Sequence, residues 1–201
     1  MQINEIMEDQ ANTAGTVLHI KNMVCNRCIM AVDKALRDLG LHPVSIVLGE
    51  ASVMETIPQE TLSVLRDSLS SLGFELIDDR RSQIIEQIKS EVIRLVHYDD
   101  AGLKVNLSEH LSRTIGRDYG SLSKLFSEVT GTTIEKYHIA QKIERAKELL
   151  AYGELSLNEI ADLLGYSSAA YLSAQFKSVT GLTPSHFRKA GASRRKPLDE
   201  V

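Results

Sequence analysis

The sequence predicts two domains of different class, an α+β domain near the N-terminus and an all-α domain after it. Between residues 16 and 78, short runs of alternating apolar residues are interleaved with two amphipathic segments, in the order βαββαβ. From residue 83 onward the apolar residues recur at helical spacing instead. One segment of that helical part is repeated at an offset of fifty residues. The repeat predicts two copies of one helical unit.

Length and composition allow both domains to bury a core. The chain has 201 residues, of which 43% are hydrophobic, enough for one or two domains. No apolar run approaches the roughly 18 residues that span a membrane, and the first fourteen residues are polar and acidic rather than a signal peptide. We therefore expect a cytoplasmic protein with no membrane partner, and flexible tails at residues 1–15 and 190–201.

The net charge of −4 conceals an asymmetry between the two domains. Residues 1–80 carry six Lys/Arg against twelve Asp/Glu, a net charge of −6. Residues 113–196 carry thirteen against eight, a net charge of +5. The basic segment is the one expected to meet phosphate groups. Its excess is modest and indicates nucleic-acid binding only together with the motifs below.

The elements of the first domain follow from the apolar spacing. Strands are predicted at Thr16–Lys21, 44–48, 51–57 and Phe74–Ile77. One helix ends at Gly40, and a second opens at Pro58. Their inward faces are predicted to be Cys28, Val32, Ala35, Leu36 and Leu39 in the first helix and Leu62, Leu65, Leu69 and Leu72 in the second. The order βαββαβ is that of the ferredoxin-like unit.

Cys25 and Cys28 are the only cysteines, and they form a CxxC motif at the start of the first helix. In a chain without an export signal, such a pair predicts reduced thiols rather than a disulfide scaffold. The helix dipole and the charge of Arg27 should lower the pKa of at least one thiol. Two thiolates suit a soft ion of low coordination number, whereas structural zinc needs four ligands. A redox dithiol and a module whose cysteines bind no metal remain alternatives.

Residues 16–78 also resemble a heavy-metal-associated domain, the fold of copper chaperones and of the metal-binding modules of metal-exporting pumps. Met23, Cys25 and Cys28 fall on the family motif MxCxxC, and Gly73-Phe74 falls on its GF or GY pair. The resemblance implies that Cys25 and Cys28 bind Cu(I) or, by analogy, Ag(I) or Hg(II). The loop departs from the family, with Asn22 for Gly, Val24 for Thr and Arg27 for a small residue.

The second domain is predicted from the repeat. Phe126–Tyr137, FSEVTGTTIEKY, recurs as Phe176–Phe187, FKSVTGLTPSHF. Upstream the offset becomes forty-nine, so that Ile115-Gly116 aligns with Leu164-Gly165. Each extended copy therefore indicates a helix, a Gly-containing turn and a second helix, the pattern of a helix-turn-helix unit. A small helical bundle without a ligand has the same pattern. Capping pairs mark the first helix of each unit, Asn106 with Glu109 and Ser156 with Glu159.

The run from Leu107 to Arg188 closely resembles the C-terminal DNA-binding region of AraC/XylS-type transcription regulators. Its sharpest part is the signature FK..TG.TP..FR, which begins at Phe176. The resemblance implies a double helix-turn-helix domain over residues 83–189, in which each second helix enters the DNA major groove. Those helices are predicted at 119–129 and, behind a cap at Ser167, at 168–179. The positions directed at DNA are Gly120, Ser121, Ser123 and Lys124 in the first unit and Ser168, Ala169, Ala170, Ser173, Ala174 and Lys177 in the second.

A helix over residues 133–151 should hold the two units on one side of the duplex. Nineteen residues span roughly 28 Å, and successive major-groove faces lie about 34 Å apart. Small side chains dominate the outward positions, with Lys124 the long charged one near the bases. We therefore expect weak discrimination between base sequences and a large share of phosphate contacts and DNA shape in binding.

Residues 79–82 are predicted to be a short charged joint, followed by a helix over residues 83–97. Because the joint leaves little slack, an ion bound at the thiols is expected to change how the acidic domain sits near the DNA-binding helices. The prediction is a transcription regulator, not an enzyme, whose N-terminal sensor domain responds to a soft metal ion. Its partners would be double-stranded DNA and, as further candidates, RNA polymerase and a second copy of the chain. The alternative is a metallochaperone or dithiol redox protein whose helical half is an interaction module.

Overall fold

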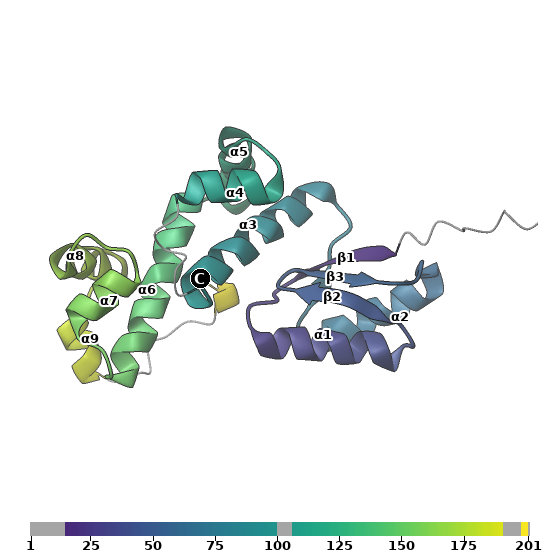
Figure 1. The fold of residues 1–201 in the computed structure, drawn as a ribbon, viewed down its shortest axis with the longest axis horizontal. Coiled ribbons are helices and arrows are strands. Elements are labelled where there is room, and N and C mark those ends of the chain that lie inside the picture. Colours follow the sequence, from purple (N-terminus) through teal and green to yellow (C-terminus); the bar gives the residue numbers. More distant parts are fainter. Residues whose placement is uncertain (1–14, 100–105, 191–197, 201) are drawn as a thin grey trace, which may run out of the picture.

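The computed structural model describes residues 15–99, 106–190 and 198–200, which form two domains lying side by side along the long axis (Figure 1). The first consists of β1 (Thr16–Lys21), α1 (Asn26–Asp38), β2 (Pro43–Val47), β3 (Glu50–Val53), α2 (Gln59–Ser71) and β4 (Glu75–Leu76). The second consists of α3 (Arg80–His97), α4 (Leu107–Ile115), α5 (Tyr119–Thr130), α6 (Ile134–Tyr152), α7 (Leu157–Leu163), α8 (Ala169–Thr180) and α9 (Pro184–Ala190). The predicted order βαββαβ, followed by helices, is confirmed in the described part of the chain.

The strands of the first domain form an antiparallel sheet in the order β2-β3-β1-β4. Thr16 of β1 lies opposite Val53 of β3, and Ile20 lies opposite Leu76 of β4. Successive residues of a strand point to opposite faces, so Leu18 and Ile20, which are two residues apart, share one face, and both are buried. The helices α1 and α2 cover that buried face (Figure 1), which places the start of α1 and its cysteines at one end of the sheet.

Two apolar residues of this domain are exposed, contrary to expectation. Val44 is 67% exposed, because a register shift between Pro43 and Ser45 turns this part of β2 outward. Leu72 is 51% exposed, because α2 ends at Ser71 and Leu72 lies in its C-terminal cap. The other predicted core positions of α2 behave as expected, and Leu65 and Leu69 are fully buried.

Each helix-turn-helix unit of the second domain has its own core. The first core is formed by α3, α4, α5 and the start of α6, and the second by α6 to α9. Their fully buried members include Ile88, Leu111, Leu122 and Phe126 in the first and Ile143, Ile160, Leu172 and Phe176 in the second. Gly116 and Gly165 occupy left-handed conformations in the two turns, with φ of +70° and +65°. A side chain at such a φ is strained. The predicted helix, Gly turn and helix are confirmed in both copies.

Several helix boundaries differ from those predicted. The helix α3 begins at Arg80 rather than after residue 82, because the Asp79 carboxylate accepts a hydrogen bond from the Ser82 amide at 2.9 Å and caps the helix. Most of the expected joint is therefore helical. Ser168, rather than Ser167, caps α8 by accepting from the Tyr171 amide at 3.1 Å.

The tails predicted at residues 1–15 and 190–201 lie mostly outside the described residues. Within the second, Leu198–Glu200 form a short 3-10 helix, η2, and the Leu198 carbonyl accepts a hydrogen bond from Gln141 at 3.1 Å. Across the described ranges, the helices lack the combination of length and apolar composition that a membrane crossing requires.

The helix α3 carries the contact between the domains along its length. Near its start, Gln83 donates to the Ile77 carbonyl at 3.1 Å. Near its middle, the turn between β2 and β3 approaches so closely that a Cβ on Gly49 would lie 2.6 Å from the Ser90 hydroxyl oxygen. Just beyond its end, the Tyr98 hydroxyl donates to the Val24 carbonyl at 2.8 Å. The two domains are thus joined at three levels of one helix.

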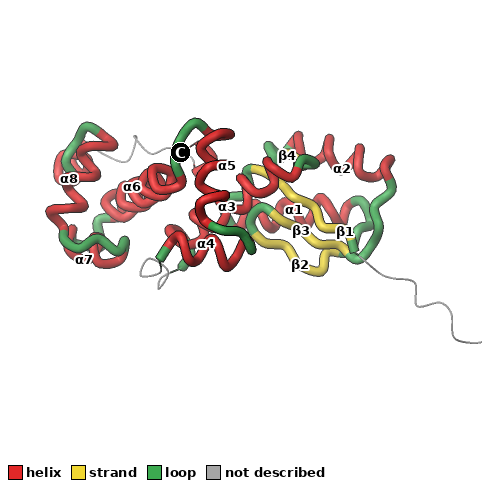
Figure 2. The backbone as a smooth tube through the Cα atoms, turned by 90° about the horizontal axis from the view of Figure 1, so that it is seen from above, coloured by secondary structure: helices red, strands yellow, loops and turns green. Residues whose placement is uncertain are grey.

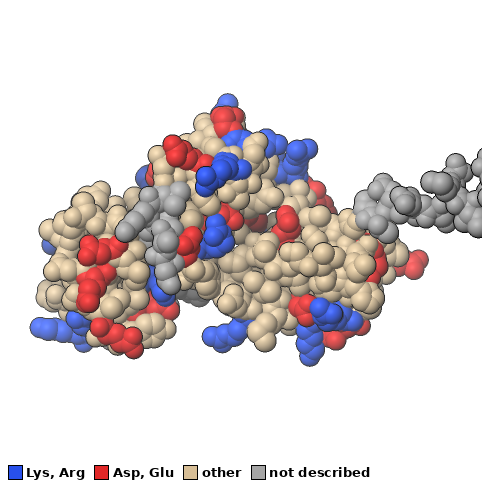
Figure 3. Space-filling model, in the orientation of Figure 1, with Lys and Arg blue, Asp and Glu red and all other residues tan. Residues whose placement is uncertain are grey.

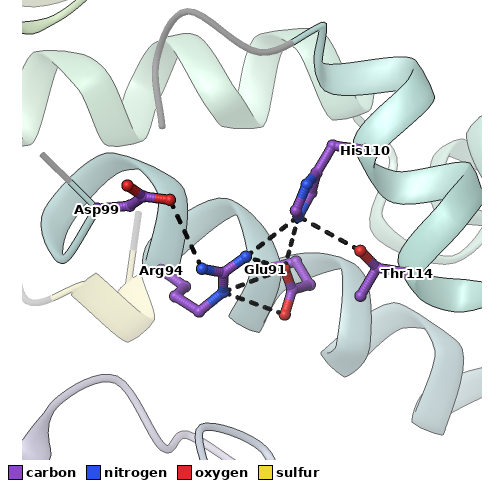
Figure 4. A network of polar contacts seen from close by, with 5 residues as sticks. All are labelled: Glu91, Arg94, Asp99, His110 and Thr114. Carbon is purple, nitrogen blue, oxygen red and sulfur yellow. Dashed lines mark hydrogen bonds and ion pairs between the residues drawn. The ribbon is translucent and has the colours of Figure 1, made fainter. Parts of the chain in front are cut away.

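A polar network fastens α4 to the last turns of α3 (Figure 4). Arg94 donates to Glu91 at 2.9 Å, and Nε2 of His110 on α4 lies 2.8 Å from the same carboxylate. Burial raises the pKa of Glu91, but the hydrogen bonds and charges of Arg94 and His110 outweigh it, so the pKa is below the usual range. The charge of Glu91 therefore helps to fix the first helix-turn-helix unit on α3.

Candidate nucleic-acid interface and thiol site

The helix α5 has one exposed and one buried side. Gly120, Ser121 and Lys124 are exposed and Ser123 is half-buried, as expected for an outward face. The opposite side is buried, with Leu122 and Phe126 fully enclosed. The Asp118 carboxylate caps the helix by accepting from the Ser121 amide at 2.9 Å, and hydrogen bonds from Ser121 hold its pKa below the usual range.

The helix α8 repeats this arrangement with two differences from the predicted set. Ser168, Ala170, Ala174 and Lys177 are exposed and Ser173 is half-buried. Ala169 is half-buried and packs against the second core, because it occupies the first position of the helix, next to the turn. The Ser168 hydroxyl oxygen caps the helix by accepting a hydrogen bond from the Tyr171 amide, so part of its hydrogen-bonding capacity is already used within the protein.

Tyr171 is an exposed residue of α8 that the predicted set omits. Its side chain is 55% exposed, and its ring lies edge-on to the Tyr166 ring with 5.9 Å between centroids. Tyr166 is itself fixed by the Lys142 ammonium group, 4.4 Å from its ring centroid. Burial lowers the pKa of Lys142 to about 8. The repeat could have predicted that Tyr171 faces outward, because the offset of fifty pairs it with Ser121, which is in the predicted outward set.

The helix α6 separates the two exposed helices. It has 19 residues, or roughly 28 Å, and Figure 2 shows α5 and α8 on opposite sides of it along the long axis. On the face drawn in Figure 3, Lys and Arg side chains are interspersed with Asp and Glu. Its positive charges are therefore spread over several elements rather than gathered in one patch.

The CxxC loop is held between β1 and α1 by Asn22 and Met23. Asn22 has a left-handed φ of +71°, which Asn adopts more readily than most residues, and its side chain donates to the Gly73 carbonyl at 3.0 Å. Met23 is 2% exposed and anchors the loop in the core. Asn22 thus holds the loop through both its backbone conformation and its side chain.

The two thiols lie together and differ in acidity. The sulfur atoms of Cys25 and Cys28 are 3.4 Å apart, and both residues are half-buried. Burial raises the pKa of the Cys25 thiol, but hydrogen bonds from Cys28 and Arg27 and the Arg27 charge outweigh it, so the pKa is lowered. Burial raises the pKa of Cys28, and its neighbour Cys25 adds to the shift. The expectation of at least one acidic thiol holds for Cys25, the cap residue of α1.

The two sulfur atoms are the candidate ligands of this loop. Among residues 15–99, 106–190 and 198–200, the structure contains no group of three or more His, Cys, Asp or Glu side chains placed to hold a metal ion. Sulfur atoms 3.4 Å apart can both reach one ion through metal–sulfur bonds of about 2.3 Å each only in a bent arrangement, because a linear one would separate them by about 4.6 Å. Tyr98 of the second domain lies beside this pair, and burial together with the charges of Cys25 and Cys28 raises the pKa of its hydroxyl.

Comparison with known proteins places the resemblance in the helical domain. Residues 111–190 match the family model described as a helix-turn-helix domain, which spans both Gly turns. The xylose operon regulatory protein of Escherichia coli (strain K12) is 35% identical over 101 residues, covering 48% of this chain and 25% of that protein. The Msm operon regulatory protein of Streptococcus mutans serotype c is 31% identical over 139 residues, covering 69% of this chain and 44% of that protein. The chain thus spans less than half the length of either relative.

Two solved structures are also similar. The C-terminal domain of AraT, a response regulator from Geobacillus stearothermophilus, is 24% identical with a TM-score of 0.48 and covers 56% of this chain and 88% of that chain. The structure of the xylose-binding transcription activator xylR is 27% identical with a TM-score of 0.44 and covers 57% of this chain and 28% of that chain.

Proposed function

We propose that residues 111–190, which match the family model of a helix-turn-helix domain, are a domain of the AraC type, and that the protein is a sequence-specific DNA-binding transcription regulator. The observation that carries the proposal is the pair of exposed, capped helices α5 and α8 on either side of α6. Their inner sides are fixed by separate cores. Each therefore presents its outer side as a rigid surface, the requirement for a recognition helix in a major groove.

The spacing supports the use of two adjacent grooves. A spacer of roughly 28 Å is comparable with the about 34 Å between successive major-groove faces on one side of B-DNA. The outward residues are mostly Ser, Ala and Gly, which make no bidentate contacts to base edges. Phosphate contacts and DNA shape then provide much of the affinity. A second copy of the chain or RNA polymerase would supply further specificity at a promoter.

The DNA-binding test is the salt dependence of affinity for genomic fragments, measured by fluorescence anisotropy. Affinity should fall steeply as salt rises, and Lys124→Ala should reduce the slope of log K against log salt by about 1, the loss of one phosphate contact. Lys34→Ala is the matched control, since Lys34 is exposed on α1 in the first domain. A slope near zero for the unaltered protein contradicts DNA binding.

For the first domain we propose a sensor of the heavy-metal-associated type with a ferredoxin-like fold, in which Cys25 and Cys28 bind one soft ion. Support comes from the strand order β2-β3-β1-β4, the sulfur separation of 3.4 Å and the lowered pKa of Cys25. A thiolate is the ligand that Cu(I), Ag(I) or Hg(II) prefers, and a lowered pKa makes the thiolate easier to form. The bound ion would be the signal that changes DNA binding.

The same thiol separation favours a second candidate, a dithiol that responds to oxidation. Cys25 as thiolate would attack a low-molecular-weight disulfide, which forms a mixed disulfide and releases one small thiol. Cys28 would then attack Cys25 in the mixed disulfide and release the second small thiol, which leaves the intramolecular disulfide. Titration against a glutathione buffer, with and without Ag(I), separates the candidates. Stoichiometric Ag(I) binding that protects both thiols favours the metal sensor. Reversible oxidation without ion binding favours the dithiol.

A further inference from the structure

Tyr98 joins the thiol loop to the end of α3. Its hydroxyl donates to the Val24 carbonyl at 2.8 Å, across 74 residues of sequence. That carbonyl belongs to the planar peptide group that carries the Cys25 amide. A change in the position of Cys25 must therefore move the Val24 carbonyl or break its hydrogen bond to Tyr98. The contact lies at the opposite end of α3 from the predicted joint.

The residue before Tyr98 reaches into the helical domain. Nε2 of His97 lies 3.0 Å from the side-chain oxygen of Gln141 on α6. The amide nitrogen of Gln141 donates to the Tyr137 hydroxyl at 3.0 Å. The Tyr137 ring packs on Phe126 with 5.7 Å between centroids, and Phe126 is the fully buried underside of α5. Contacts are thus continuous from the thiol loop to the first recognition helix.

The hydrogen bonds of Gln141 should change together, because its side chain is buried. Gln141 is fully buried, and its amide also donates to the Leu198 carbonyl at 3.1 Å. A buried amide that loses a partner pays its full desolvation cost. A shift of the α3 end that withdraws His97 must therefore be matched by a new arrangement of Gln141 and the groups that it holds. Such a cluster favours discrete arrangements over gradual deformation.

We propose that Tyr98 couples the state of the thiol pair to DNA binding by α5, through the contacts of Val24 with Tyr98, His97 with Gln141, and Tyr137 with Phe126. The inference rests on the proposed function and adds the route of regulation. An ion held by both sulfurs fixes the Cys25 backbone and with it the acceptor of the Tyr98 hydroxyl. Tyr98 is a positioning residue and not a ligand of the ion.

The test compares the unaltered protein with Tyr98→Phe, which removes the hydroxyl and keeps the ring. DNA affinity is measured by anisotropy with and without one equivalent of Ag(I) under reducing conditions, and Ag(I) affinity with and without DNA. In the unaltered protein each ligand should change the affinity of the other by the same factor, about 5- to 150-fold. In Tyr98→Phe that factor should fall to within about twofold of 1, with the ion still bound.

The matched control is Tyr152→Phe, because the Tyr152 hydroxyl is exposed on α6 and donates only at the surface, to Glu148 at 3.2 Å. It should retain the full coupling factor. Full coupling in Tyr98→Phe, or an ion without effect on a DNA-binding unaltered protein, overturns the inference and leaves DNA binding standing. Failure to bind DNA in any state contradicts the proposed function instead.

A second measurement needs no ion. In the ion-free protein, amide hydrogen exchange of residues 22–28 should be faster in Tyr98→Phe than in the unaltered chain, and unchanged in Tyr152→Phe, because only the former loses the bond to Val24. Equal thermal melting of the two variants shows that the change is local. Identical exchange of the loop in all three proteins overturns the coupling role of Tyr98.

Discussion

At the residue scale, two chemically identical side chains acquire different acidities from the backbone around them. Cys25 caps α1 and receives hydrogen bonds from the amides that follow, whereas Cys28 lies one turn in and is more buried. The motif alone predicts an acidic thiol without saying which. The structure lowers the pKa of the first thiol and raises that of the second, so Cys25 is the more acidic of the two.

Single substitutions of the thiols test this asymmetry. In Cys28→Ser the remaining Cys25 should titrate below the ordinary pKa of a free thiol, and Arg27→Ala should raise that pKa by removing the adjacent cation. In Cys25→Ser the remaining Cys28 should titrate above Cys25. Thiolate absorbance against pH measures both pKa values.

Either single variant should lose stoichiometric Ag(I) binding, because one thiolate cannot provide two-sulfur coordination. Tight binding by a single variant would locate the site elsewhere.

At the element scale, the boundaries and faces of α5 and α8 decide which side chains the proposed interface would present to DNA. The outer side of α8 contains one large residue, Tyr171, among small ones. Tyr171→Ala should lower DNA affinity by about 1 kcal/mol, the low end of the range for a base-edge contact. Anisotropy at fixed salt measures the effect. Ser121→Ala at the equivalent position of α5 is the control for the loss of a small polar group, and an equal, small effect of both variants would exclude Tyr171 from the interface.

The attachment of α4 to α3 gives a dependence of stability on pH. The folded pKa of Glu91 is lowered, so its contribution is present above the unfolded value near 4.5 and is lost as pH falls through the folded pKa. Glu91→Gln should reduce stability at neutral pH by about 1 kcal/mol, discounted for partial exposure, and should have little effect well below pH 4.5. Thermal melting across pH measures this. Glu128→Gln, in an exposed pair with Arg81, should change little at any pH.

The sequence predicts those elements whose bounds are determined by residues within or next to the element itself. The bounds of β1, Thr16–Lys21, agree with the prediction because alternation and flanking polar residues define them. The cap of α8 was misplaced by one residue because Ser167 and Ser168 are chemically equal, and only the extended backbone at Ser168 distinguishes them. The CxxC site was visible as a motif. The Tyr98–Val24 contact was not, because it joins residues of different domains whose approach depends on the whole of α3.

At the scale of the whole molecule, α3 makes the two domains one mechanical unit. A cleft of about 680 Å³ remains between them, lined by Lys21 and Asp78 of the first domain and by Phe126 and Val129 of α5. The acidic domain thus flanks one end of the first recognition helix. The coupling expected through the short joint stays a prediction, and the contacts that would carry it are distributed from the start of α3 to Tyr98.

The closest of these contacts gives a test of that rigidity. Gly49 has a φ of +83°, and a Cβ there would lie 2.6 Å from the Ser90 hydroxyl oxygen but 3.5 Å from the Ser90 Cβ. Gly49→Ala therefore has two costs, a left-handed backbone of about 1–2 kcal/mol and the collision with Ser90. Ser90→Ala removes the collision alone. In a double-mutant cycle the backbone cost cancels, and Gly49→Ala should be less destabilising in the Ser90→Ala background by about 1 kcal/mol.

Gly40→Ala provides the matched control, since Gly40 has a φ of +73° and its Cβ would meet nothing within 4 Å. It should have the backbone cost only, unchanged by Ser90→Ala. If the domains instead separate readily in solution, the turn can withdraw from α3 without cost, and Gly49→Ala should then resemble Gly40→Ala in both backgrounds. Urea unfolding of the unaltered protein, the three variants of the cycle and the two controls decides between a rigid pair of domains, through which a change at the thiols can reach α5, and two independent ones.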